Sequence, residues 1–225
     1  RYRPARMKKV SEPAVARLSL YMRLLGELEA EGLHTASSEL LARRGGLTAA
    51  QVRKDLSQFG SFGRRGQGYP VAELHAALRS ILGLERQWRV GLVGVGKIGA
   101  ALLGYDDFRR QGFCIEVAFD ADPGKVGTRV NGVEVRPDAE LEEVLKANPV
   151  DILIVAVPAA AAQPVVERAV ASGVRAILNF APAKLRLPAG IALRSVNLAI
   201  ELEGLSFALA NDARRNARGA GRTNR

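Results

Sequence analysis

Hydrophobic residues in the first third of the chain recur at the three- and four-residue spacing that is typical of amphipathic helices. Gly32 and the polar, glycine-bearing turn at residues 43–46 separate successive stripes. The pattern predicts an α-rich domain over residues 1–84, in which residues 70–84 form a helix that links this domain to the next. The four stripes are Leu18, Met22, Leu25 and Leu28; Leu40 and Leu41; Val52, Leu56 and Phe59; and Leu74, Leu78 and Ile81.

The rest of the chain alternates between short apolar runs and helical segments. Residues 88–93, 115–119, 151–157 and 174–178 are predominantly apolar, as expected of strands that a parallel sheet buries on both faces. Helices are expected to begin at residue 100 and to cover residues 159–172. This alternation predicts an α/β, Rossmann-like domain over residues 85–199.

A last helix is expected over residues 200–213, where Leu202, Leu205 and Leu209 share one face. A helix this apolar at a chain end usually buries that face, and a partner subunit is one candidate for the cover. Residues 214–225 contain no apolar side chain larger than alanine, so this basic tail is expected to be disordered, as are residues 1–9.

The formal net charge of +10 is concentrated near the two ends of the chain. Residues 1–86 hold 15 Lys and Arg against 8 Asp and Glu, whereas residues 87–225 hold 18 against 15, including five arginines from residue 214 on. Such a field favours a polyanionic partner, although a solvated basic surface explains the charge equally well. The single cysteine, Cys114, excludes an internal disulfide, and the start lacks an apolar signal core, so a cytoplasmic location is expected without a membrane span.

Two helix starts and a glycine-rich segment indicate a winged helix-turn-helix domain. Thr48 and Gln51 have the spacing of a capping box, and Ser37 can cap the preceding helix. The helix that follows Thr48 has an apolar face and a polar face, the division that a recognition helix in the major groove needs. An ordinary helical bundle with a basic face is the alternative. The candidate DNA-binding residues, which include those of a basic wing within residues 60–68, are Ser37, Thr48, Gln51, Arg53, Lys54, Ser57, Arg64, Arg65 and Gly66.

The motif Gly94-Val-Gly96-Lys-Ile-Gly99 directly follows a predicted strand and begins a helix, as in dinucleotide-binding folds. Asp120 ends the next strand about 20 residues later, where a carboxylate holds a ribose hydroxyl. Because Ala121 follows, no basic residue is expected beside Asp120 for a 2′-phosphate, and NADH/NAD⁺ is favoured over NADP(H). Another nucleotide or coenzyme A is the alternative.

Ligands of such sheets bind beyond the carboxyl ends of the strands, which places the residues after two further strands near the nicotinamide, unless they are plain loop structure. The candidate cofactor-binding residues are Gly94, Val95, Gly96, Lys97, Ile98, Gly99, Asp120, Val157, Pro158, Asn179 and Phe180.

The sequence favours a sensor over an enzyme. Residues 87–225 contain no histidine and no recognisable nucleophile–base pattern, and no His/Cys cluster has metal-ligand spacing. Two alternatives remain: a small NAD-dependent oxidoreductase with a basic accessory domain, and a DNA-binding protein whose Rossmann-like domain only dimerises.

The chain resembles the redox-sensing transcriptional repressors of the Rex family. The resemblance rests on residues 48–60 with the glycine-rich segment after them, and on residues 93–99, 119–127 and 177–182. It implies a homodimer that exchanges its C-terminal helix between subunits and binds an inverted-repeat operator DNA. It also implies that NADH releases the DNA and that NAD⁺ competes for the same pocket.

The same resemblance implies a switch in which a tyrosine, an arginine and an aspartate change partners between states. Tyr105 and Arg23 match the first two positions, but the third falls at Asn197, where the family pattern has aspartate. An Arg–Asn contact lacks charge pairing, so this departure weakens the expected contact to roughly half the strength of a charge-assisted one.

Overall fold

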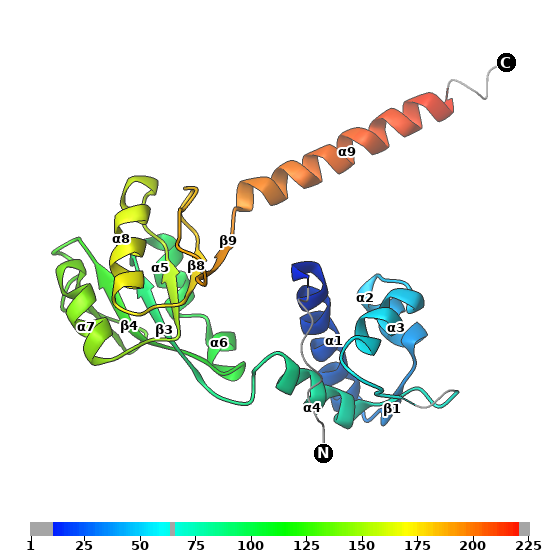
Figure 1. The fold of residues 1–225 in the computed structure, drawn as a ribbon. Coiled ribbons are helices and arrows are strands. Elements are labelled where there is room, and N and C mark those ends of the chain that lie inside the picture. The colour runs from blue at the N-terminus through cyan, green and yellow to red at the C-terminus, as the bar shows by residue number, and fades with distance from the viewer. Residues whose placement is uncertain (1–10, 64–65, 221–225) are drawn as a thin grey trace. The chain divides into compact units, whose positions relative to one another are not determined.

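The computed structural model describes residues 11–63 and 66–220, with side chains described as far as residue 211 (Figure 1). The chain divides into two compact units, Arg1–Gln87 and Trp88–Arg225. The first is α-rich and the second is an α/β unit, which confirms the predicted fold class. No helix in the described ranges combines the length and the apolar character that a membrane span requires.

The first unit contains four helices and one short antiparallel strand pair among its described residues. Strands β1 (Thr35–Ala36) and β2 (Tyr69–Pro70) pair across the helix pair that lies between them in sequence. The helices are α1 (Glu12–Ala30), α2 (Ser38–Gly45), α3 (Ala49–Ser57) and α4 (Val71–Ile81).

Helix α4 is part of the hydrophobic core of the first unit. It packs on α1, and Val71, Leu74 and Leu78 are buried in the same hydrophobic core as the α1 stripe. The reason is its apolar face, which is as continuous as that of α1 and must be covered. The unit therefore extends to Gln87, three residues beyond the expected boundary.

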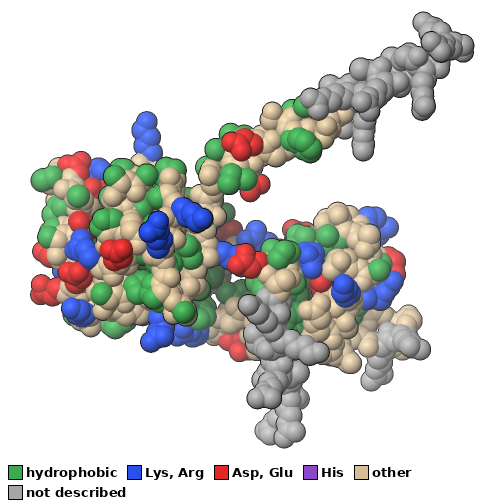
Figure 2. All heavy atoms as spheres, turned by 45° about the horizontal axis from the view of Figure 1, so that its top comes forward, with side chains coloured by type: hydrophobic (Ala, Val, Ile, Leu, Met, Phe, Trp, Pro, Cys, Tyr) green, Lys and Arg blue, Asp and Glu red, His purple; other side chains and the backbone are tan. Residues whose placement is uncertain are grey.

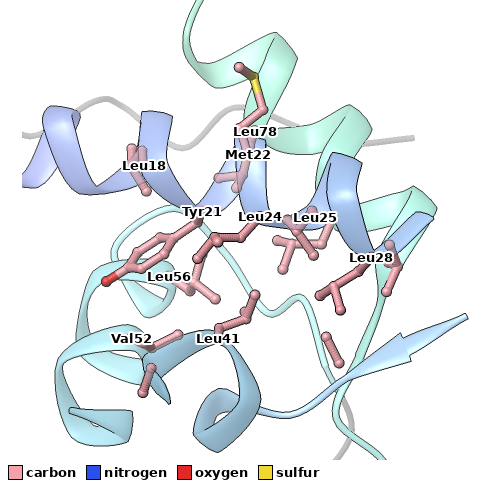
Figure 3. Close-up of a cluster of buried hydrophobic side chains, with 14 of the residues drawn as sticks. Leu18, Tyr21, Met22, Leu24, Leu25, Leu28, Leu41, Val52, Leu56 and Leu78 are labelled. Carbon is pink, nitrogen blue, oxygen red and sulfur yellow. The ribbon is translucent and has the colours of Figure 1, made fainter. Parts of the chain in front are cut away.

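The core of the first unit gathers the leucine stripes of all four helices (Figure 3). Every predicted apolar position of α1 is buried, and Tyr21 and Leu24 widen the buried face. On α2, Leu41 is buried, while Leu40 is only half-buried. Helices α2 and α3 have only eight and nine residues, so packing against the core rather than intrinsic helix propensity stabilises them.

One buried carboxylate joins α3 to α1. Asp55 is 1 % exposed and accepts two hydrogen bonds from Arg17, at 2.6 and 2.8 Å. The Tyr21 hydroxyl donates to the same carboxylate at 2.8 Å, as does the Gln51 side-chain amide. Burial by itself would raise the pKa of Asp55, but the hydrogen bonds from Arg17, Tyr21 and Gln51 outweigh it and hold the pKa below its ordinary value.

The second unit is a seven-stranded sheet with the order β5-β6-β4-β3-β7-β8-β9. All neighbouring strands are parallel except β5 and β6. Without β5, this is the strand order of a Rossmann fold, with its crossover between β3 and β7. The strands are β3 (Trp88–Val93), β4 (Phe113–Asp120), β5 (Arg129–Val130), β6 (Val133–Pro137), β7 (Ile152–Val155), β8 (Ala176–Asn179) and β9 (Ala192–Ser195).

Helices cover both faces of this sheet, and alternate residues of the strands contribute to two separate cores. On β3, Val93 packs with α7 and α8, whereas Leu92 packs with α5 and α6. The pattern of the sequence did not predict β5, β6, β9, α6 or α7. The helices are α5 (Lys97–Leu103), α6 (Asp106–Arg110), α7 (Leu141–Ala147) and α8 (Ala159–Ala171), with a 3-10 turn at Asp138–Glu140.

The last helix, α9 (Leu198–Ala220), is longer than the predicted 200–213. The expected disorder of the tail is therefore wrong for residues 214–220, because alanine and arginine are strong helix formers without any large apolar side chain. Residues 221–225 lie outside the described residues, as do residues 1–10. The apolar side chains of α9, visible in Figure 2, are between 59 % and 73 % exposed: Leu198, Ile200, Leu202, Leu205, Phe207 and Leu209.

We expect Asp55→Asn to destabilise the protein by about 3 kcal/mol, because it breaks a buried ion pair and leaves Arg17 without its charged partner. Glu31→Gln is the matched control, since Glu31 forms an equally short pair with Arg44 that is exposed at 46 % and 30 %. This control should leave the free energy of unfolding nearly unchanged, because solvent screens the exposed pair. Urea titrations followed by circular dichroism measure both values.

The loss of stability caused by Asp55→Asn should become smaller in acid. A carboxylate whose folded pKa lies below its ordinary value of about 4 contributes its full stability above that value. The contribution is lost as the pH falls through the folded pKa. The difference between wild type and variant should thus be constant above about pH 5 and narrow below about pH 4. Equal losses of stability in Asp55→Asn and Glu31→Gln would contradict the assigned role of Asp55. So would a stability difference between wild type and Asp55→Asn that grows as the pH falls.

Candidate functional site

The candidate cofactor site lies where the strand order of the sheet reverses, between β3 and β7. Strands β3 and β7 are neighbours, and their carboxyl ends lead to Gly94 and to the Ala156–Pro158 segment. The Ala156 amide donates to the Val93 carbonyl, and the Phe180 amide donates to the Val155 carbonyl, each at 2.8 Å. The predicted residues after β3, β4, β7 and β8 therefore meet at one edge of the sheet, which is where such folds bind nucleotides.

The glycine turn needs its first and third glycines for different reasons. Gly94 has a φ of +94°, and a Cβ there would press on the carbonyl of Ala156. A Cβ on Gly99 would overlap the carbonyl oxygen of Gly94, so this glycine allows α5 to begin directly against the turn. Gly96 has open space on its Cβ side and is exposed, together with Lys97 and Ile98. The turn at residues 94–99, the glycine cradle, is thus packed against the protein on one side and open on the other.

Asp120 braces this turn. Its Oδ2 accepts from the Val95 amide at 2.7 Å and from Lys125 Nζ at 3.1 Å, and its Oδ1 accepts from the Asp122 amide at 2.9 Å. Burial would raise the pKa of Asp120, but these amides and Lys125 outweigh that effect and hold the pKa below its ordinary value. The carboxylate therefore stays ionised beside the glycine turn.

The prediction that no basic residue stands beside Asp120 is wrong. It considered only the next residue, but the turn at residues 121–127 folds back and brings Lys125 into an ion pair with both Asp120 and Asp122. Lys125 is a functional candidate that the sequence analysis missed. The signal was present in the Asp122-Pro-Gly sequence, which is typical of a tight turn.

The residues after β7 and β8 differ in how they can act. Val157 and Phe180 are half-buried and Pro158 is exposed. Asn179, in contrast, is fully buried: its Oδ1 accepts from the Ala181 amide at 2.9 Å, and its Nδ2 donates to the Ala181 carbonyl at 3.1 Å. The structure thus favours Asn179 as a residue that shapes the loop at this edge, while its neighbours supply the surface.

The second candidate site comprises α2, α3 and the glycine-rich segment of the first unit. Ser37 caps α2 by accepting from the Leu40 amide at 3.1 Å, and Thr48 caps α3 by accepting from the Gln51 amide at 3.2 Å. The reciprocal half of the predicted capping box does not form. The Gln51 side-chain amide donates instead to the buried Asp55 carboxylate at 2.8 Å, which holds this side chain against the core rather than against the Thr48 amide.

The outer face of α3 is exposed as predicted, but two of its polar groups are already engaged. The Ser57 hydroxyl donates to the Lys54 carbonyl at 2.8 Å. Nη1 of Arg53 donates to the Ser38 hydroxyl at 2.8 Å and to Glu39 Oε1 at 3.0 Å. Lys54 is exposed. Glu39, on α2, is therefore a second residue that the sequence analysis missed.

A groove of about 570 Å³ runs between these elements. Close packing sets its far wall, since a Cβ on Gly68, whose φ is +77°, would press on the Ala36 carbonyl. Arg64 and Arg65 of the predicted wing lie outside the described residues, and Gly66 lies in a turn. The groove is lined by Ser37, Ser38, Glu39, Arg53, Leu56, Ser57, Gly60, Ser61, Phe62, Gly63, Gly66, Gly68 and Tyr69.

The three predicted switch residues lie on different elements. Arg23 is exposed on α1, in the first unit. Tyr105 is 54 % exposed before α6 and packs edge-to-face on Phe108, with ring centroids 5.0 Å apart. Asn197 precedes α9 and accepts from the Ala199 amide at 3.0 Å through its Oδ1, a contact that an aspartate could also make.

No group of three or more potential metal ligands is present within the described ranges.

Two family models match parts of the chain. Residues 9–57 match "Putative DNA-binding protein N-terminus", and residues 85–183 match "CoA binding domain". The first covers α1 to α3, and the second covers the sheet as far as the loop after β8. The second matched segment contains the sheet-edge residues from Gly94 to Phe180, whereas the first contains α2 and α3 but ends before the glycine-rich segment of the groove.

Curated relatives match over nearly the whole chain. The Redox-sensing transcriptional repressor Rex of Desulfitobacterium hafniense is 49 % identical over 88 % of this chain and 95 % of its own length. The protein of the same name from Streptomyces coelicolor is 45 % identical over 92 % of this chain and 80 % of its own length.

Solved structures agree with the sequence relatives. The crystal structure of RSP, a Rex-family repressor, in complex with β-NAD⁺ and operator DNA matches with a TM-score of 0.87 and 35 % identity, over 94 % of this chain and 98 % of that one. The structure of RSP with β-NADH matches with a TM-score of 0.85 and 33 % identity, over 93 % and 99 % of the two chains. On this identity, coverage and fold, the chain belongs to the Rex family of redox-sensing transcriptional repressors.

Proposed function

We propose that this chain is a dimeric repressor that binds operator DNA through α3 and releases it when NADH occupies the sheet edge. The observation that carries the proposal is the presence, in one chain, of a glycine cradle and a capped helix pair in the order found in RSP, which has been solved with β-NAD⁺ and operator DNA and with β-NADH. Turnover of the cofactor is not required for this role.

The sheet edge fits a dinucleotide. The exposed amides at Gly96, Lys97 and Ile98 begin α5 beside open space, and helix amides of this kind bind pyrophosphate. Asp120 has one remaining acceptor position on Oδ1 for a ribose hydroxyl, since one donor occupies it and two occupy Oδ2. When bound, the nicotinamide supplies a ring whose charge differs between its oxidised and reduced states. Val157, Pro158 and Phe180 would surround that ring.

The groove of the first unit fits duplex DNA. Capped helix starts at Ser37 and Thr48 place backbone amides near the phosphates, and Arg53 and Lys54 lie on the exposed face of α3. Gln51 and Ser57 have local partners and would contribute after rearrangement. Arg64, Arg65 and Gly66 would bind the backbone or the minor groove as a wing.

Helix α9 supplies the interface for the homodimer. Leu198, Leu202, Leu205 and Leu209 form one stripe, while Ile200 and Phe207 project from the opposite side. A helix that is apolar around its circumference requires cover on both sides. Exchange of α9 between two copies of the chain would supply that cover.

Cofactor and DNA are coupled through the arrangement of the two subunits. Two recognition helices must lie about 34–36 Å apart, or a multiple of that distance, to reach successive major grooves. NADH shifts the equilibrium only by its differential affinity for the two arrangements. In the proposed switch, Tyr105 and Asn197 exchange contacts with Arg23, and Asn197 provides a neutral hydrogen bond where the family pattern has an ion pair.

We expect NADH to release bound DNA at a lower concentration than NAD⁺. Because binding coupling is reciprocal, the same DNA should weaken NADH binding by an equal factor, about 5- to 150-fold. Band-shift titrations at fixed NAD⁺ and calorimetry with and without DNA measure the two factors. Release at equal concentrations of the two cofactors, or NADH binding that the DNA leaves unchanged, would reject the proposed coupling.

Gly96→Ala should weaken cofactor binding without harming the fold. Its backbone angles are open to alanine and its Cβ meets no protein atom, but the methyl group would occupy the outer side of the cradle. We expect the Kd for NADH to rise by about 10-fold or more while the melting temperature changes by less than about 2 °C. Gly99→Ala is the contrasting variant, since its Cβ would overlap the Gly94 carbonyl and should lower the melting temperature as well. Normal NADH affinity in Gly96→Ala would place the cofactor elsewhere.

Introducing charge into the α9 stripe should produce monomers. The double variant Leu202→Glu and Leu209→Glu would bury two unpaired carboxylates in the proposed interface, at a cost of about 3 kcal/mol for each. Light scattering should then report the mass of one chain, 24.1 kDa, in place of twice that value. Glu203→Gln, on the same helix and exposed, is the control and should remain dimeric. A dimer in the double variant would move the interface away from α9.

A further inference from the structure

The contact between Arg53 and Glu39 joins the two helices of the groove at its surface. Nη1 of Arg53 is held by the Ser38 hydroxyl and by Glu39, and that hydroxyl lies 3.3 Å from both carboxylate oxygens of Glu39. All three residues line the groove. The arginine that is best placed for a base edge is therefore attached to a carboxylate on the preceding helix.

This ion pair adds little to the stability of the fold. The side chains of Arg53 and Glu39 are 55 % and 67 % exposed. Exposed ion pairs of this kind are screened by solvent and contribute little to stability. A carboxylate in a groove that binds a polyanion also weakens the attraction for phosphate. The position of Glu39 is thus better explained by what it does to Arg53 than by what it does to folding.

Glu39 is ionised when it makes this contact. Its own backbone amide, at the start of α2, lowers the pKa of the carboxyl, and hydrogen bonds with Ser37, Arg53 and Ser38 outweigh the opposing effect of burial. The negative charge is consequently present throughout the neutral pH range.

The geometry leaves one edge of the guanidinium for a ligand. Among the described residues, the hydrogen bonds of Arg53 involve Nη1, and no partner for Nε or Nη2 is present. Nε and Nη2 form a planar pair of donors, which is the arrangement that matches N7 and O6 of guanine. Fixing Nη1 leaves this pair in one orientation and reduces the rotamer freedom that binding would otherwise remove.

We propose that Glu39 determines specificity in the DNA interface: it orients Arg53 for a base edge, and its charge disfavours complexes held by phosphate contacts alone. This inference rests on the proposed function, because it assigns a role within the same groove. Removing the charge should weaken binding to the correct sequence and strengthen binding to any other sequence, and loss of a merely structural residue would not produce those opposite changes.

Glu39→Gln in the full-length chain tests the proposal. The specific probe is a duplex that the wild-type protein enriches from a randomised pool, and the non-specific probe is a scrambled duplex of the same composition. Both dissociation constants are measured by fluorescence anisotropy at one salt concentration with NAD⁺ present. We expect the specificity ratio, the Kd for the scrambled duplex divided by the Kd for the enriched duplex, to fall by about 10-fold. The Kd for the enriched duplex should rise, and the Kd for the scrambled duplex should fall.

Glu31→Gln is the matched control. It removes the same charge and breaks a comparable exposed pair with Arg44, but Glu31 does not line the groove. Its specificity ratio should match that of the wild type.

Glu39→Asp separates the two parts of the proposal. It keeps the charge but shortens the side chain, so affinity for the enriched duplex should fall while affinity for the scrambled duplex stays unchanged. An unchanged ratio in Glu39→Gln, or parallel weakening of both probes, would overturn the role of Glu39. Failure of the wild type to enrich any duplex would instead overturn the proposed DNA-binding function itself.

Discussion

The orientation of the recognition helix depends on one buried carboxylate. Helix α3 has nine residues, too few to be stable in isolation, and a polar outer face that contributes nothing to the core. Its inner face is held by leucine and valine packing, which resists separation but only weakly resists rotation. Asp55 supplies the directional contacts through Arg17 and Tyr21 of α1. The outer face can therefore be selected for DNA because the inner face already defines the angle of the helix.

The second unit uses a buried aspartate for a related purpose. Asp120 accepts from the amide of Val95, in the middle of the glycine turn, and so fixes the backbone of that turn. In both units a carboxylate accepts enough hydrogen bonds to remain ionised despite burial. Each one holds in place the backbone or helix whose remaining donors face outward. The functional surfaces are thus pre-organised by charges that lie beneath them.

The sequence predicted the parts of the fold that follow from local periodicity and from short motifs. The helices α1 to α4, the strands β3, β4, β7 and β8, and the glycine turn were all of this kind. The strands β5, β6 and β9 each contain a charged residue, so they lack the continuous apolar run that made the equally short strands β7 and β8 recognisable. Helix α9 extends past its apolar stripe because alanine and arginine sustain a helix without a buried face.

The missed site residues depend on contacts across the sequence. Asp55 and Arg17 are 38 residues apart, and Glu39 and Arg53 are 14 apart, so periodicity cannot pair them. Asp55 did leave a signal, since it interrupts the apolar face that Val52 and Leu56 define. A charged residue on a buried stripe requires a partner, and the only open question from sequence was which one. Lys125 was missed for the opposite reason, because a turn of a few residues returned it to Asp120.

The position of Arg17 on α1 gives the proposed switch a short mechanical route. Arg23 lies six residues further along the same helix, a rise of about 9 Å. Both arginines belong to one uninterrupted α-helix of 19 residues with a buried leucine face. In the proposed switch, a displacement of Arg23 by a new partner would be transmitted along this helix to Arg17, and so to Asp55 and α3. No chain of intermediate side chains is needed, because one helix carries both the residue that would sense the cofactor domain and the residue that holds the recognition helix.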